Sequence, residues 1–201
     1  MGLDQFLSAK LYIGGCYEHN GITGTIDIKK RPVKYNHDKN EYEPTGPEEP
    51  FIQMTNLSQV EDITLRVGYW RKANAIHKWF VDQVAEGEDD CQPVHVERSQ
   101  LEELKRLCEE VLSKSLLIDG KVRNGQHFAN GKWEDIIIDG KIVFGAEAAM
   151  EKLPTTEGLF FGSTDYDMWY IQDLQNTVEI ITKALSDPLL KDCDFEYRAS
   201  W

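Results

Sequence analysis

Residues 69–80 read YWRKANAIHKWF, and the spacing of apolar residues changes within this stretch. Before it, apolar and polar residues alternate as in a half-buried strand, at Ile63, Leu65 and Val67. From its middle onward, apolar residues recur at helical spacing, at Ala73, Ile76, Phe80 and Val84. The stretch therefore predicts a strand within residues 58–69 and a helix over about residues 71–85.

Further strands and helices are predicted on both sides of this stretch. The helix over residues 100–114 has the capping-box spacing at Ser99 and Glu102. A last long helix opens at Ser163-Thr164-Asp165 and ends at Asp187-Pro188. Residues 158–162 indicate a buried strand or a tight turn, and short strands are expected at residues 10–14, 24–29, 94–96 and 195–201.

The order of these elements shows no regular β-α-β alternation, so the sequence predicts an α+β fold. We expect a mixed or antiparallel sheet and about three helices in a single domain over residues 1–201. The polar, proline-containing segment 30–50 is predicted to be a loop.

Residues 116–148 differ from the rest of the chain. The run Ile118-Asp-Gly-Lys-Val122 recurs as Ile138-Asp-Gly-Lys-Ile142, and Asn-Gly pairs lie between the two runs. Asp-Gly and Asn-Gly between apolar stretches are strong hairpin signals. This region is therefore predicted to be a small β-meander inserted in the main fold as a hairpin subdomain.

The net charge of −13 narrows the classes of partner. A strongly acidic surface repels nucleic acid and anionic membranes, so it either favours basic partners or only keeps the protein soluble. The chain has no signal-peptide pattern and no apolar run long enough for a membrane span. We therefore expect a soluble cytoplasmic protein whose four cysteines are reduced.

Two short cysteine–histidine pairs could hold a metal ion. Cys16 and His19 form one pair, and Cys91 and His95 form the other. Two thiolates and two imidazoles make a closed tetrahedral set for structural Zn²⁺. The alternative is that the cysteines are ordinary thiols and the histidines lie on the surface, because the gap between the pairs far exceeds that of a zinc finger.

Three other groups of residues could carry chemistry. His77 lies at the edge of the apolar face of its helix, where it is either a general base or a packed, hydrogen-bonded histidine. Asp165 and Asp167 are either paired functional carboxylates or residues that cap a helix start. Asp89 and Asp90 are either paired functional carboxylates or residues of a solvated turn. The aromatic set could stack bases, form core or serve a partner interface: Tyr69, Trp70, Trp79, Trp169, Tyr170 and Trp201.

Several blocks together resemble a family of small acidic proteins encoded by bacteriophages and prophages, generally described as uncharacterised. The blocks are Gly2-Leu3-Asp4, residues 69–80, Asp89-Asp90-Cys91, residues 153–156, residues 160–163, Tyr166-Asp167 with Trp169-Tyr170, and Ser200-Trp201. The resemblance covers most of residues 60–115 and 150–201. It implies a phage origin, and small acidic phage proteins are often accessory factors that disable host machinery such as CRISPR effectors.

These observations lead to three functional hypotheses. The first is a non-catalytic phage-encoded inhibitor whose acidic surface binds a basic host protein, such as a CRISPR effector nuclease or another nucleic-acid enzyme. The second is a small metal-dependent hydrolase that uses His77 with Asp89, Asp90 or the Asp165–Asp167 pair. The third is a phage structural or assembly component.

Overall fold

The computed structural model describes residues 2–13, 24–39, 41–54, 57, 60–129, 131–158 and 160–201. Contacts divide the chain into two compact units, Met1–Leu11 with Thr64–Trp201, and Tyr12–Ile63. That division concerns contacts within the folded chain. The prediction of one domain over residues 1–201 concerns independent folding, and it stays a prediction.

The larger unit is built on a four-stranded sheet of order β6-β1-β10-β7. Its strands are β1 (Asp4–Tyr12), β6 (Asp62–Arg71), β7 (Val94–Val96) and β10 (Asp194–Ser200). Strand β10 pairs antiparallel with both β1 and β7. The α+β class is confirmed, and so is the strand predicted at the end of the sequence.

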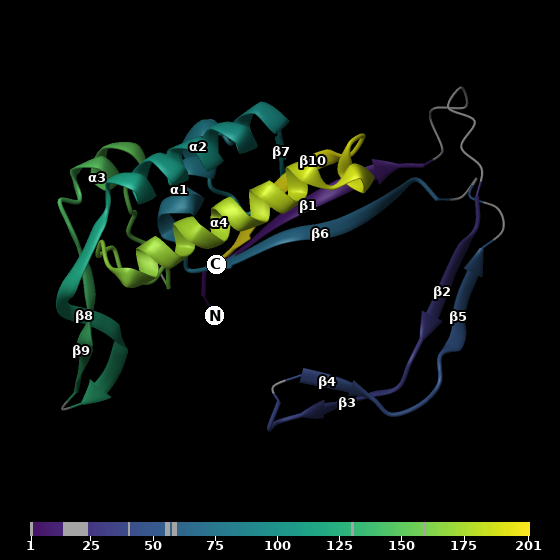
Figure 1. Cartoon of the computed structure of the whole chain (residues 1–201), viewed down its shortest axis with the longest axis horizontal. Coiled ribbons are helices and arrows are strands. Elements are labelled where there is room, and N and C mark those ends of the chain that lie inside the picture. Colours follow the sequence, from purple (N-terminus) through teal and green to yellow (C-terminus); the bar gives the residue numbers. More distant parts are fainter. Residues whose placement is uncertain are drawn as a thin grey trace. The chain divides into compact units, whose positions relative to one another are not determined.

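One face of the sheet is covered by helices (Figure 1). These are α1 (Asn74–Gln83), α2 (Arg98–Lys114) and α4 (Met168–Ser186). Helix α3 (Glu147–Lys152) packs on α2, and the 3₁₀-helix η2 (Pro188–Leu190) packs on α4. Alternate residues of the central strands are buried on this face, namely Gln5, Leu7 and Ala9 of β1 and Phe195, Tyr197 and Ala199 of β10. This alternation is the two-residue period of a strand with one covered face.

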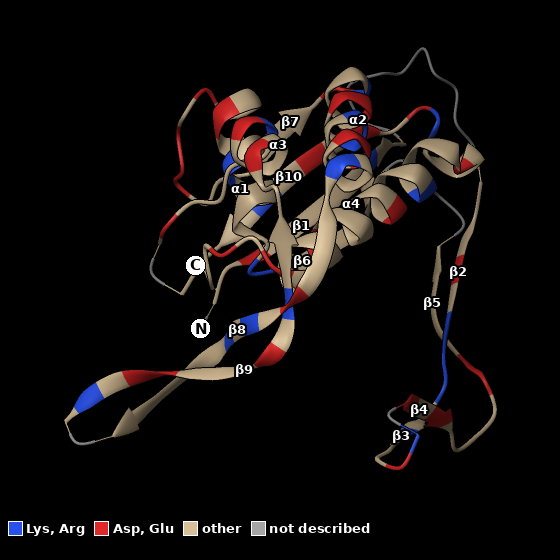
Figure 2. Cartoon of the chain, turned by 60° about the vertical axis from the view of Figure 1, so that its left-hand side comes forward, with Lys and Arg blue, Asp and Glu red and all other residues tan. Residues whose placement is uncertain are grey.

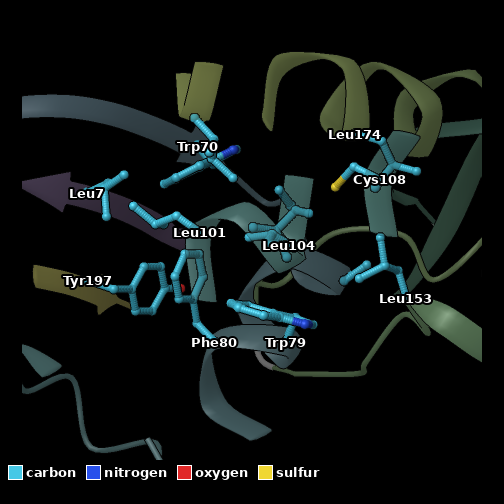
Figure 3. Packing of buried hydrophobic residues seen from close by; sticks show 14 of the residues in the cluster. Leu7, Trp70, Trp79, Phe80, Leu101, Leu104, Cys108, Leu153, Leu174 and Tyr197 are labelled. Atoms are coloured by element: carbon cyan, nitrogen blue, oxygen red, sulfur yellow. The ribbon is translucent and has the colours of Figure 1, made fainter. Parts of the chain in front are cut away.

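The core lies between the sheet and helices α1, α2 and α4. Figure 3 shows Phe80 against Tyr197, and these rings stack with their centroids 3.9 Å apart. The Trp70 indole donates a hydrogen bond to Thr177 Oγ1 of α4 over 2.9 Å, which satisfies its only polar group inside the core. The predicted apolar faces of the helices therefore form one core.

The helix starts differ from those predicted. Helix α2 is capped by Glu97 and Gln100, whose side chains form the reciprocal capping box assigned to Ser99 and Glu102. Helix α4 is capped by Asp167, whose Oδ1 accepts from the backbone N–H groups of residues 169 and 170. Both differences are shifts of a few residues at helix ends, where several polar residues can serve as caps.

Residues 116–144 form one long hairpin, as the hairpin signals predicted, with two long strands in place of the several short strands of a meander. Strands β8 (Leu116–Ala129) and β9 (Lys132–Phe144) pair along their whole length, with a bulge between Arg123 and Gln126. The Asp-Gly pairs lie inside the strands, and the glycines face each other as Gly120↔Gly140. We call β8 and β9 the ribbon; Figure 2 shows that it extends away from the helices.

The smaller unit contains strands where a loop was predicted, so that prediction is wrong. Its strands are β2 (Ile26–Lys30), β3 (Val33–Asn36), β4 (Glu41–Pro44) and β5 (Glu49–Met54). They form two separate two-stranded sheets, β2-β5 and β3-β4. Every strand of a two-stranded sheet has a free edge, and this accommodates prolines that a central strand would exclude.

No helix within the described parts of the chain combines the length and apolar character that a membrane span requires.

Candidate functional site

His77 lies inside the larger unit and is hydrogen-bonded through both ring nitrogens. Its side chain is buried in α1. Nδ1 lies 2.8 Å from the Tyr197 hydroxyl, and Nε2 lies 3.0 Å from Asp89 Oδ2. The structure therefore brings together His77 and Asp89, two residues that the hydrolase hypothesis combined.

A chain of hydrogen bonds extends from this histidine in both directions. The Tyr197 hydroxyl donates to Gln5 Oε1 over 3.0 Å, and Gln5 Nε2 donates to the Ala73 carbonyl over 3.2 Å. On the other side, Trp201 Nε1 donates to Asp89 Oδ1 over 3.1 Å. The chain of bonds links β1, α1, β10 and the loop that follows α1, so it fixes Asp89 relative to the sheet.

Both ring nitrogens of His77 are engaged in hydrogen bonds, one with the Tyr197 hydroxyl and the other with the Asp89 carboxylate. The carboxylate can only accept, so Nε2 donates to it. His77 then holds Asp89 in place, which is the packed and hydrogen-bonded alternative.

Burial reinforces this arrangement at the tyrosine. Tyr197 is almost completely buried, and burial raises the pKa of its hydroxyl well above the ordinary value. The hydroxyl therefore keeps its hydrogen and continues to donate to Gln5.

The loop after α1 holds Asp89 with an unusual backbone conformation. Glu86 and Cys91 have φ angles of 54° and 63°, in the left-handed region that non-glycine residues seldom adopt. The Asp90 carboxylate accepts from the backbone N–H of Gln92 over 3.0 Å, which closes a tight turn. Asp90 is thus a turn residue, in agreement with the solvated-turn alternative. Cys91 lines a cavity of only about 20 Å³ beside His77.

A second loop is fixed against the start of α1 by Asn74. Its amide nitrogen donates to the carbonyls of Ser163 and Phe161 over 2.7 and 3.3 Å, and its Oδ1 accepts from the Thr156 N–H over 3.2 Å. This places the Phe161 ring edge-on to His77, with ring centroids 5.1 Å apart. The turn needs positive φ angles at Phe160 and Gly162.

Between these loops lies a groove of about 360 Å³, which we call the acidic groove. Its lining includes three carboxylates, on Asp82, Asp89 and Glu157, and two aromatic rings, on Phe161 and Trp201. Lys78 also lines the acidic groove, but its ammonium group is paired with Asp82 over 2.7 Å. The lining is therefore suited to a cationic group, which carboxylates attract and aromatic faces also favour.

Most blocks that carry the phage-family resemblance meet at this place. They supply Asn74 and His77, Asp89, Thr156, Phe161 and Trp201, from segments far apart in the sequence. Sequence reasoning treated His77, the acidic pairs and the aromatic residues as separate groups. It missed Gln5, Asn74 and Tyr197. The sequence marks them only by position, since Asn74 lies within one of these blocks and the other two lie close to one.

The proposed zinc ligands are only partly covered by the structure. Cys16 and His19 lie outside the described residues. Cys91 lines the small cavity, and His95 is exposed with its Nε2 3.2 Å from Glu97 Oε1. In the described ranges, no three residues among His, Cys, Asp and Glu form a group suited to a metal ion. The zinc site stays a prediction.

The Asp165–Asp167 pair is engaged elsewhere. Asp167 caps α4, and burial raises the pKa of its carboxyl despite the two backbone donors. Asp165 accepts from Ser163 Oγ over 2.6 Å and lies 3.8 Å from the Arg123 guanidinium of the ribbon. The helix-capping alternative therefore accounts for Asp167.

The aromatic set divides between core and surface. Trp70, Trp79 and Tyr170 are buried in the core, whereas Tyr69, Trp169 and Trp201 remain roughly half-exposed. Trp201 is the one that lines the acidic groove. No family model, curated protein or solved structure matches the chain.

Proposed function

We propose that this chain is a non-catalytic binding protein whose acidic groove takes a basic segment of a partner protein. The observation that carries the proposal is the lining of the acidic groove, where three carboxylates stand beside the Phe161 and Trp201 rings. Because His77 and Trp201 hold Asp89, its carboxylate is ordered before a partner arrives. Preorganisation of this kind reduces the entropy lost on binding.

The proposed biological setting follows from the resemblance. A phage-encoded accessory protein of this kind would act in the host cytoplasm and bind a basic host protein that handles nucleic acid or defends the cell, a CRISPR effector nuclease being one example. The net charge of −13 supports this class of partner, because basic nucleic-acid-binding surfaces attract acidic proteins over long distances.

A defined basic probe tests the acidic groove directly. An arginine-rich peptide should bind the protein at low ionic strength and weaken as salt rises to about 0.5 M, because salt screens exposed charges. Glu157→Gln should weaken binding about threefold, since it removes one exposed charge from the lining. Glu102→Gln, an equal charge change on exposed α2, is the matched control.

Capture from host lysate then tests the setting. Retention of a basic host protein at low salt, with loss at high salt and in the Glu157→Gln variant, is expected. The proposal fails if no host protein is retained, or if Glu157→Gln and Glu102→Gln reduce retention equally.

A metal-dependent hydrolase remains a second candidate, because His77 and Asp89 lie 3.0 Å apart beside the acidic groove. For His77 to bind a metal or accept a proton, it must first lose one of its two hydrogen bonds. A screen of phosphate and ester substrates with Mg²⁺, Mn²⁺ and Zn²⁺ tests this candidate. If the protein turns over a substrate and His77→Gln abolishes that turnover, catalysis and not binding is its function.

A further inference from the structure

Strand β8 presents a free edge. The ribbon is a two-stranded sheet, and β9 is the only strand paired with β8 in the described structure. The outer edge of β9 is engaged, because Val143 N–H donates to the Tyr166 carbonyl over 3.0 Å and residue 142 bridges to residue 167. An unpaired strand edge can accept another strand through its backbone N–H and C=O groups.

The sequence along this edge is complementary to itself. In the ribbon, Ile118-Asp-Gly-Lys-Val122 pairs antiparallel with Ile138-Asp-Gly-Lys-Ile142, which is nearly the same sequence. The register places Gly120 opposite Gly140, Lys121 opposite Asp139, and Asp119 opposite Lys141. The chain itself thus provides an example of two such strands pairing with opposite charges face to face.

We propose that two copies of the chain associate through this edge, with β8 of each copy antiparallel to β8 of the other around Gly120. This register repeats the one inside the ribbon. It places Asp119 opposite Lys121 of the partner subunit, twice by symmetry, and gives a four-stranded sheet with strand order β9-β8-β8-β9.

Side chains on both faces favour this arrangement. On one face, acidic and basic residues alternate across the four strands, in the order Asp139, Lys121, Asp119 of the partner subunit and Lys141 of the partner subunit. Within the single chain, Lys121 already lies 2.6 Å from Asp139. On the other face, Ile118 comes to lie beside Val122 of the partner subunit and extends the row that Ile118 and Ile142 begin. Val122 is already buried in the single chain, so the apolar surface gained on this face comes from Ile118. Ile118 is 38% exposed in the single chain, so it has apolar surface to bury.

Charge favours this edge as the place where two acidic copies meet. The ribbon has equal numbers of acidic and basic residues, whereas the whole chain has a net charge of −13. The acidic residues are Asp119, Glu134, Asp135 and Asp139, and the basic ones are Lys121, Arg123, Lys132 and Lys141. Repulsion between copies is therefore weakest where the ribbons approach.

Charge reversal tests the register. Sedimentation of the full chain over a range of concentrations should show a dimer. Asp119→Lys alone and Lys121→Asp alone each place like charges opposite one another at both symmetric positions. Each should weaken the dimer on the order of tenfold or more. Both side chains are exposed, so neither change should prevent folding, and circular dichroism checks this.

Mixing the two variants gives the sharper result. In a mixed pair, the lysine introduced at position 119 of one variant faces the aspartate introduced at position 121 of the other. The two unchanged side chains, Lys121 of the first variant and Asp119 of the second, also face each other. The equimolar mixture should therefore form a heterodimer, although neither variant dimerises well with itself. Lys132→Glu changes a charge at the far end of the ribbon and serves as the control that keeps the wild-type dimer.

Three outcomes would overturn the proposal: a wild-type chain that stays monomeric at every concentration, single variants that dimerise like the wild type, or a mixture that does not recover the dimer. Hydrogen exchange of the unmodified chain is an independent check. Amides of residues 117–123 should become more protected as concentration rises, and unchanged protection there would also reject this edge.

Discussion

The acidic groove draws its residues from segments spread over most of the larger unit, whereas the ribbon is one continuous stretch of sequence. The acidic groove depends on buried polar contacts that reach from β1 to β10. The ribbon depends on neighbouring strands, and its charged side chains stay exposed. The acidic groove should therefore be sensitive to single buried changes, and the ribbon should tolerate most surface changes.

Replacement of two histidines tests this difference most strongly. His77→Ala removes two hydrogen bonds and leaves a space inside the core, so it should lower the free energy of unfolding by about 3 kcal/mol. His127→Ala on the ribbon removes an exposed side chain and should change it by less than about 0.5 kcal/mol. Urea unfolding measures both. Equal effects would contradict the comparison.

Replacement of two glycines compares a tightly packed position inside the ribbon with an open position in the loop after α1. A methyl group at Gly140 would lie 2.5 Å from Val122 Cγ2, so Gly140→Ala should cost about 2 kcal/mol through overpacking. Gly87, in the loop that carries Asp89, has φ +87° and open space around it. Gly87→Ala should cost only about 1 kcal/mol of backbone strain. Thermal unfolding of the two variants checks the order.

The pH dependence of stability should come partly from Asp173 of helix α4. Burial, with a smaller effect of Asp167, raises the pKa of Asp173 to about 7. The folded state thus favours the protonated carboxyl, and this contribution to stability, complete below about pH 4, is lost as pH rises through 7.

Asp173→Asn isolates that contribution. At pH 8 the variant should be more stable than the wild type by about 1–2 kcal/mol, less than the full linkage because the side chain keeps some contact with water. At pH 4 the difference should disappear. A variant equally stable at both pH values would show that Asp173 is not desolvated.

The aromatic pair at the tip of the ribbon should show only a small effect. Trp133 is 66% exposed and meets Phe128 edge-on, with ring centroids 5.4 Å apart. Trp133→Ala should lower stability by about 0.5 kcal/mol, the value of one exposed aromatic pair. It should leave peptide binding at the acidic groove unchanged. A larger loss of stability would mean that the tip packs against something within the fold.

The sequence predicted those features that depend on local periodicity. The switch near residue 71, the strand at Val94–Val96 and the end of α4 before Pro188 all agree with the structure. The hairpin of the ribbon was predicted, but the number of its strands was not, because Asp-Gly pairs can lie within the strands of a hairpin as well as at its turns. A dipeptide alone does not show whether it lies inside a strand or at a turn, whereas the pairing of the two strands over their whole length does.

The acidic groove could be anticipated only in part. His77 and Asp89 were each considered, but their contact needs a loop with left-handed residues at Glu86 and Cys91, which neither periodicity nor composition predicts. Gln5 and Tyr197 meet because β1 and β10 are neighbours in the sheet, and that contact joins opposite ends of the sequence. The loop predicted over residues 30–50 is wrong because Pro44 and Pro50 lie in strands β4 and β5, whose two-stranded sheets leave a free edge that tolerates proline.

The hydrogen bond between Trp201 and Asp89 gives the acidic groove an optical reporter. The indole is half-exposed, lies in the lining and donates directly to the carboxylate that a cationic ligand would approach. Any ligand that competes for this carboxylate or covers the ring changes the electric field and the solvent around the chromophore. Intrinsic tryptophan emission can therefore follow occupancy of the acidic groove in the unlabelled protein, and Trp201→Phe supplies the reference emission of the other tryptophans, Trp70, Trp79, Trp133 and Trp169.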